Sequence, residues 1–113
     1  MIIQKNTTFF NTASEPAISK AVFNAASDTL SLQVDGDFTN GTFYIEGRNS
    51  AEGEWYPIAA VDLTHLTVYR NGLTQPGLYE FAIVSVREIR ARIAEIEGGT
   101  VSISGQLIAT EET

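Results

Sequence analysis

Hydrophobic and polar side chains alternate along several short stretches of this chain, which is the pattern expected of half-buried β-strands. In the clearest stretch, three apolar residues alternate with three polar ones: Leu30, Leu32 and Val34 with Ser31, Gln33 and Asp35. After a break that contains the turn dipeptide Asn40-Gly41, the alternation resumes at Phe43 and Ile45. We predict that these two segments form a β-hairpin.

The same alternation recurs between Gly77 and Gly105, and we interpret this stretch as the inner sheet of a β-sandwich. Its apolar positions are Tyr79, Phe81 and Ile83, then Ile89, Ala91 and Ile93, then Val101 and Ile103. Further strands are predicted at residues 55–58, continuing to 63, at 66–69 and at 101–109.

A helix is the alternative for residues 85–97. Ser85 and Glu88 have the spacing of a capping box, and Gly98 would suit a helix C-terminus. Val86, Ile89, Ile93 and Ile96 also fall at helical spacing. We favour a strand, because Arg90 and Arg92 would then point away from the apolar positions around them. A helix here would make the fold α+β.

The pattern therefore predicts an all-β protein, an antiparallel β-sandwich of jelly-roll or Ig-like type with about seven to eight short strands. Residues 1–16 are expected to form an N-terminal arm with at most one short strand, and residues 17–109 the sandwich domain. The segment 17–26 is ambiguous between a strand and a helical turn. Residues 110–113 form a polar, acidic tail that we expect to be flexible.

Composition narrows the class of protein further. The chain has 113 residues and a formal net charge of -7, so it is large enough for one domain and badly suited to neutralising nucleic-acid phosphates. It contains no cysteine, which excludes disulfides and thiolate chemistry. Neither a signal peptide nor an apolar stretch long enough to span a membrane is visible, so we expect a soluble protein.

Catalytic and metal-binding patterns are weak, and we predict neither an enzyme nor a cofactor. Asp35 and Asp37 could offer carboxylates to calcium, but a turn between strands explains them better. His65 is the single histidine, and we interpret it as a partly exposed loop residue because no triad or second histidine accompanies it.

Two pairs of aromatic residues are candidates for binding surfaces. Trp55 and Tyr56 could form an exposed platform for a sugar ring, although a single Trp in a sandwich more often fills the core, which is the reading we favour. Phe9 and Phe10 either close one end of the core, which we favour, or dock on a neighbouring subunit.

Arg90 and Arg92 share one strand face in the predicted structure. They could lie on a solvated surface, pair with acids across the sheet such as Glu80 or Glu46, or pair with acids on another subunit. A solvated sheet face is the default, and an inter-subunit ion pair is the sharper alternative.

The run from Leu32 to Gly105 resembles a small β-sandwich module of tailed-bacteriophage virion proteins, of the capsid decoration and head fibre type. The resemblance is carried by the segments 34–38, 42–47, 55–58, 77–79, 89–92 and 98–105, which begin with Val34-Asp35-Gly36-Asp37-Phe38 and end with Gly98 to Gly105. None of these segments contains a catalytic signature.

The resemblance implies a structural or attachment role on a virion that assembles in the bacterial cytoplasm. The expected partners are further copies of this chain, in a trimer or another homo-oligomer, and a major capsid or other virion protein. A carbohydrate-binding module that touches a host-surface glycan is the alternative. Interaction with nucleic acid or membrane is not expected.

Overall fold

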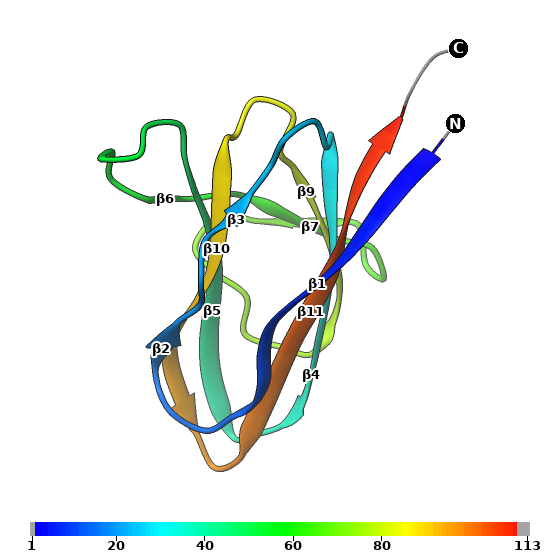
Figure 1. Cartoon of the computed structure of the whole chain (residues 1–113). Coiled ribbons are helices and arrows are strands. Elements are labelled where there is room, and N and C mark those ends of the chain that lie inside the picture. The colour runs from blue at the N-terminus through cyan, green and yellow to red at the C-terminus, as the bar shows by residue number, and fades with distance from the viewer. Residues whose placement is uncertain (1, 111–113) are drawn as a thin grey trace.

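The computed structural model describes residues 2–110, and within this range the chain forms strands and loops without a helix (Figure 1). The strands are β1 (Ile2–Ala13), β2 (Ala17–Ile18), β3 (Val22–Phe23), β4 (Thr29–Asp37), β5 (Asn40–Arg48), β6 (Tyr56–Pro57), β7 (Ala60–Asp62), β8 (Thr67–Tyr69), β9 (Gly77–Ala82), β10 (Glu88–Glu97) and β11 (Thr100–Thr110). Of the predicted acidic tail, residues 110–113, Thr110 ends β11 and the last three residues lie outside the described range.

The strands form two packed antiparallel sheets, so the prediction of an all-β sandwich is confirmed. The larger sheet has the order β1-β11-β4-β9-β7-β8, and the smaller has the order β2-β10-β5-β6 with β3 also paired to β10. The number of strands exceeds the predicted seven to eight, because β2, β3 and β6 contain two residues each. Such short strands carry no alternation that a sequence pattern could register.

One long two-stranded ribbon bends in its middle and so contributes to both sheets. β4 pairs with β11 in the larger sheet, and their direct continuations β5 and β10 pair in the smaller one. Both strands bend at the same level, at residues 38–39 and at Gly98-Gly99, where the amide of Thr39 donates to the carbonyl of Glu97 at 2.8 Å. Gly98 has a φ of 76°, a conformation that glycine adopts without strain. The bend stacks one half of the ribbon on the other, as strands that switch sheets do.

This bend overturns two of the sequence predictions. The predicted hairpin is wrong, because β4 and β5 lie in different sheets and are not paired. The interpretation of 77–105 as a single inner sheet is also wrong, since β9 and β11 belong to the larger sheet and β10 to the smaller one. A short polar break with Asn-Gly suits a bend between sheets as well as a tight hairpin turn.

Residues 88–97 form strand β10, so the preferred strand is confirmed and the helical alternative is wrong. The loop before it is held by Asn24, which is 7% exposed. Its amide nitrogen lies within 2.9 Å of the carbonyl oxygens of Ile83 and Val86, and its backbone amide donates to the carbonyl of Arg87 at 2.7 Å. These bonds fix 83–87 as a loop before β10.

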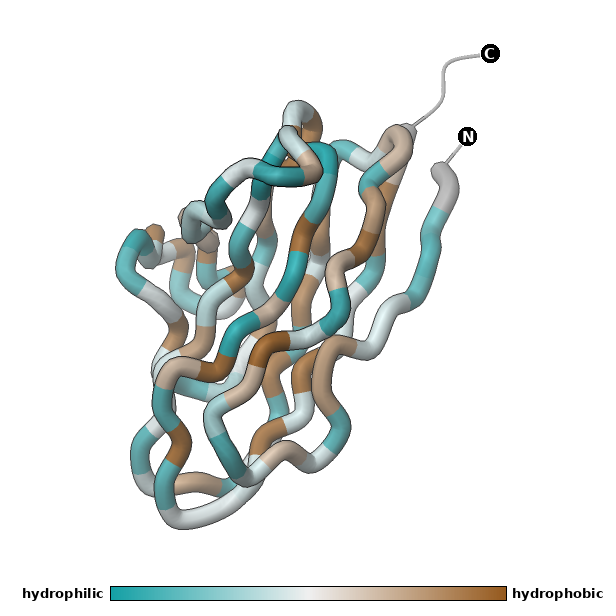
Figure 2. Tube along the Cα trace, turned by 60° about the vertical axis from the view of Figure 1, so that its left-hand side comes forward, coloured by the Kyte–Doolittle hydropathy of each residue, from teal (hydrophilic) through white to brown (hydrophobic). Residues whose placement is uncertain are grey.

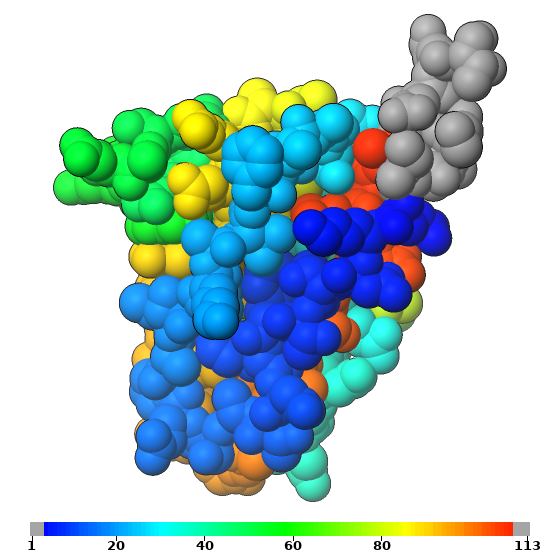
Figure 3. All heavy atoms as spheres, in the orientation of Figure 1, coloured from blue at the N-terminus to red at the C-terminus, as the bar shows by residue number. Residues whose placement is uncertain are grey.

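The N-terminal segment is an integral part of the sandwich. The expectation of at most one short strand in residues 1–16 is wrong, because β1 spans 12 residues and pairs with β11 along its length. The ambiguous segment 17–26 contains the two short strands β2 and β3 on the opposite sheet. Figure 3 shows this N-terminal part, in blue, covering the side of the molecule between β10 and β11. It therefore closes the open side of the sandwich.

A bulge in β1 places both phenylalanines toward the core. The register with β11 shifts between Thr8 and Phe10, so two successive side chains need not point to opposite faces. Phe9 is buried in the core and Phe10 packs against it. The reading in which the pair closes the core is thus confirmed.

Alternate residues of both sheets are buried between the sheets, and Figure 2 shows the matching alternation of hydrophobic and hydrophilic positions along the strands. The core contains Leu30, Leu32, Val34, Tyr79, Phe81, Val101, Ile103 and Leu107 from the larger sheet and Phe43, Ile45, Ile89, Ala91 and Ile93 from the smaller one. Burying each large apolar side chain contributes about 1.5–3 kcal/mol. The core is filled by these side chains, so binding functions must lie on the outer faces and loops.

Candidate functional site

The outer face of the smaller sheet carries a network of arginines around one buried carboxylate. Glu46 on β5 is 5% exposed, and its two carboxylate oxygens accept from Nε of Arg90 at 2.9 Å and from Nε of Arg92 at 3.0 Å. A second pair joins Arg48 to Glu88 at 3.3 Å. Of the pairings considered for Arg90 and Arg92, the one with Glu46 is confirmed and the one with Glu80 is wrong, because Glu80 lies in β9 of the other sheet.

Aromatic rings cover this network. The ring of Trp55 lies over the guanidinium groups of both Arg48 and Arg90, at 4.4 and 4.3 Å from its centroid, and Arg92 lies 4.5 Å from the ring centroid of Tyr44. Such contacts stabilise each pair by about 0.5–1 kcal/mol at partly exposed sites. The favoured reading of Trp55 as a core filler is wrong, since the residue is partly exposed on the outside of the sheet.

A broad cleft lies beside this network, between the β5–β6 loop and the segment that contains Val86. It has a volume of about 710 Å³, and its lining includes Arg48, Asn49, Glu54, Tyr56 and Ile58. Tyr56 is 65% exposed, whereas the neighbouring Trp55 is engaged with the two arginines. The structure therefore leaves Tyr56, and not the predicted pair, as an exposed aromatic ring.

The turn between β7 and β8 is held by a single carboxylate. One oxygen of Asp62 accepts from the backbone amides of Thr64 and His65, at 2.8 and 3.2 Å, and the other lies 3.0 Å from Nδ1 of His65. The hydrogen bond from the His65 side chain and those from the two amides lower the pKa of Asp62, against a smaller opposing effect of burial. The side chain of His65 is exposed in this loop, as predicted.

This rigid turn supports an exposed apolar surface, which we name the edge patch and define as Val61, Leu63, Leu66, Val68 and Leu78. Val61 and Val68 are direct partners across β7 and β8, and the amide of Leu63 donates to the carbonyl of Leu78 at 3.0 Å. Leu66 is 79% exposed and has a φ of 56°, a backbone conformation that is costly for a residue with a Cβ atom. No sequence pattern marked the patch, because its residues also fit buried strand positions.

Metal and membrane sites are not indicated. Within residues 2–110 there is no group of three or more side chains suited to hold a metal ion, and Asp35 and Asp37 lie at the exposed end of β4. The same range contains no helix long and apolar enough to cross a membrane.

The fold is a two-sheet antiparallel sandwich that carries the edge patch and the Tyr56 cleft on its outside. Both surfaces are suited to contact with other molecules. The model of the XepA family matches residues 4–107, and the chain therefore belongs to this family. A search of curated proteins gives no match.

Two solved structures share the fold. The SPBc2 prophage-derived protein YomS superposes with a TM-score of 0.87 over 96% of both chains, at 14% sequence identity. The PBSX exported protein XepA superposes with a TM-score of 0.84 over 96% of this chain, at 22% identity. This chain spans 38% of the length of that protein. The names of both proteins agree with the resemblance to phage proteins.

Proposed function

We propose that this protein is a structural component of a phage particle or prophage product, which acts by attachment to other protein surfaces and not by catalysis. Membership of the XepA family supports the phage association, since one structural relative is named as prophage-derived and another as an exported protein. A place on the virion, as a capsid decoration or a head or tail appendage, is our more specific proposal.

The observation that carries the attachment role is the edge patch. Five of the large apolar side chains exposed in the described part of the chain gather at one end of the larger sheet. Contiguous apolar surface of this kind typically marks a protein contact. A strained and exposed Leu66 at its tip is hard to explain by the stability of the isolated chain, because a polar residue or glycine would suit that position better.

The partner that we propose for the edge patch is another copy of this chain, in a trimer or another closed ring. Closed symmetry is the usual form of soluble homo-oligomers, and the acidic charge would keep free subunits soluble until they assemble. A major capsid protein or another virion protein is the further partner that decoration requires.

Light scattering at several protein concentrations tests this assignment. We expect a mass that is a multiple of 12.3 kDa, and a shift to the single-chain mass in Leu66→Asp. Val84→Asp is the matched control, because Val84 is 73% exposed and lies outside the edge patch. A single-chain mass for the unaltered protein at all concentrations, or equal effects of the two substitutions, would overturn the homo-oligomer.

Recognition of a host-surface carbohydrate is a second candidate function, which the exposure of Tyr56 favours. Its ring lines the cleft together with Asn49, Ser50 and Glu54, and stacking of a ring beside polar side chains is a common way to bind sugars. Glycan-array binding that is lost in Tyr56→Ala, but kept in Tyr69→Phe, would support this function. Binding unaffected by Tyr56→Ala would exclude the cleft as its site.

A further inference from the structure

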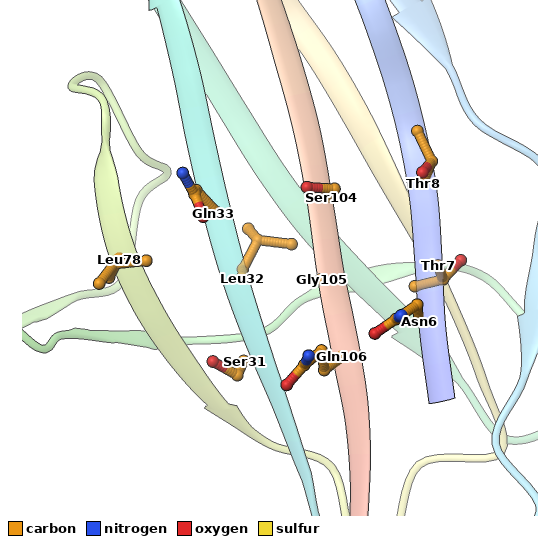
Figure 4. A pocket seen from close by; sticks show the side chains of 10 residues that line it. All are labelled: Asn6, Thr7, Thr8, Ser31, Leu32, Gln33, Leu78, Ser104, Gly105 and Gln106. Carbon is orange, nitrogen blue, oxygen red and sulfur yellow. The ribbon is translucent and has the colours of Figure 1, made fainter. Parts of the chain in front are cut away.

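A shallow trench crosses the outer face of the larger sheet, over strands β1, β11, β4 and β9 (Figure 4). Its two walls are rows of polar side chains: Thr8, Ser104 and Gln33 on one side, and Asn6, Gln106 and Ser31 on the other. Within each row the residues are direct partners across neighbouring strands. The trench has a volume of about 440 Å³.

The floor of the trench is formed by the sheet itself. Leu32, which lies between the two rows on β4, is 1% exposed because its side chain points into the core. Its partner on β11, Gly105, lies on the same inward side, so the backbone of the two strands forms the floor between the rows. The two walls are therefore separated by two residues along each strand, which is about 7 Å, and the trench extends about 14 Å across four strands. These dimensions suit a narrow, extended chain better than a compact small molecule.

The walls offer both donors and acceptors without a formal charge. Amide side chains carry two donor hydrogens and an acceptor oxygen, and hydroxyl groups can both donate and accept a hydrogen bond. Within residues 2–110, Gln33 is the member of the six that bonds another protein group, donating to the carboxylate of Asp35 at 2.9 Å. The other five side chains form no hydrogen bond with the described part of the chain and can bind a ligand along both edges. Leu78, which belongs to the edge patch, marks the β9 end of the trench.

The charges around the trench restrict the kind of chain that it can accept. No lysine or arginine lines it, while Asp35 adjoins Gln33 and Glu80 lies directly opposite Ser31. A polyanion would meet these carboxylates and the overall charge of -7 without a compensating cation. We infer that the trench binds a neutral polysaccharide chain, whose hydroxyl groups exchange hydrogen bonds with both walls. This site is on the opposite sheet from the Tyr56 cleft and is independent of it.

The inference can be tested by NMR titration of the full chain with neutral oligosaccharides, using cellotetraose and chitotetraose as probes and tetragalacturonate as the anionic comparator. We expect millimolar binding, because the trench is shallow and open, with amide shifts concentrated at Ser31, Gln33, Ser104 and Gln106. The anionic tetramer should give no shifts at these residues. Absence of shifts with both neutral probes at tens of millimolar would overturn the proposal.

Substitutions then separate this site from the cleft. The double change Gln33→Leu with Gln106→Leu keeps the side-chain sizes and removes an amide from each wall, so binding should weaken about tenfold. Gln75→Leu, at an exposed loop position, is the matched control and should bind as the unaltered protein does. Tyr56→Ala should also leave the affinity unchanged. Shifts that map to the Tyr56 cleft and vanish in Tyr56→Ala would contradict binding in the trench and favour the cleft. If the double variant does not fold, the positions of the shifts in the unaltered protein still distinguish the trench from the cleft.

Discussion

Glu46 lies directly opposite Arg90 across the β5–β10 pair, and Nε of Arg90 lies 2.9 Å from Oε1 of Glu46. Arg92, two residues along the same strand, binds the second oxygen, so one buried carboxylate is shared by two guanidinium groups. Each arginine in turn stacks on an aromatic ring. Arg90 and Arg92 thus hold this chain together through Glu46, and an ion pair between them and another subunit stays a prediction.

We predict that Glu46→Gln destabilises the fold by about 1–3 kcal/mol, because it removes the charge that both arginines bind. The side chains of Arg90 and Arg92 are partly exposed, so water compensates for part of the loss. Chemical denaturation measures the effect. Glu95→Gln is the control, because Glu95 is an exposed acid on β10 of the same sheet and should change the free energy of unfolding by less than about 0.5 kcal/mol. Equal effects of the two substitutions would show that the shared carboxylate adds nothing.

A second prediction concerns the buried amide of Asn24. Asn24→Ala leaves the carbonyls of Ile83 and Val86 without the donor that they have in the structure, and we expect a loss of about 2–3 kcal/mol. For a chain of this length, the melting temperature should fall by roughly 8–12 °C. Asn71→Ala, at an exposed turn, is the comparison and should leave the melting temperature within about 2 °C. A small effect at Asn24 would mean that water replaces its amide.

The third prediction follows from the turn that Asp62 holds. Its pKa is lowered in the folded protein, chiefly by the hydrogen bond from His65, so the ionised carboxylate stabilises the fold above the pKa of the unfolded chain. This contribution is fully present above about pH 4 and is lost as the pH falls through the lowered value. We therefore expect Asp62→Asn to melt earlier than the unaltered protein at pH 7, and the gap to narrow below about pH 4. A gap that stays constant to pH 2 would contradict the assignment.

The alternation of hydrophobic and polar residues predicts which segments are strands, but it does not predict which sheet each strand joins. The alternation of Arg90 and Arg92 with buried residues distinguished β10 from a helix, since period two places both arginines on one face. Sheet membership depends instead on the bend near Asn40-Gly41 and Gly98. A bend and a hairpin use the same residue types, so the sequence could not separate them.

The sequence predicts a contact of the candidate sites only where each residue has few possible partners. Glu46 was among the acids considered for Arg90 because the two segments were both expected to be strands with known alternation. The position of Trp55 could not be predicted, because it depends on arginines from two strands whose pairing was unknown. The sequence also gives no indication of the trench, since the walls combine residues from β1, β11 and β4. The sequence pattern predicts an N-terminal arm where the structure has β1.

The last prediction separates the stability of the chain from its assembly. Leu66 has a φ of 56°, which costs a residue with a Cβ atom about 1–2 kcal/mol, whereas glycine adopts it freely. Leu66→Gly should raise the free energy of unfolding by up to about 1 kcal/mol, after the greater flexibility of the unfolded chain is subtracted. It should also weaken self-association at the edge patch, because the most exposed apolar side chain there is gone.

Leu63→Gly is the matched control, since it removes a similar exposed side chain of the same patch at a residue that does not have a positive φ. It should weaken association without any gain in stability. Urea denaturation at low protein concentration gives the first quantity, and light scattering at high concentration gives the second. A stability that falls in Leu66→Gly would mean that the side chain is held by contacts within the chain. If stability rises and association is unchanged, the strain at Leu66 is real but the edge patch is not the contact between subunits.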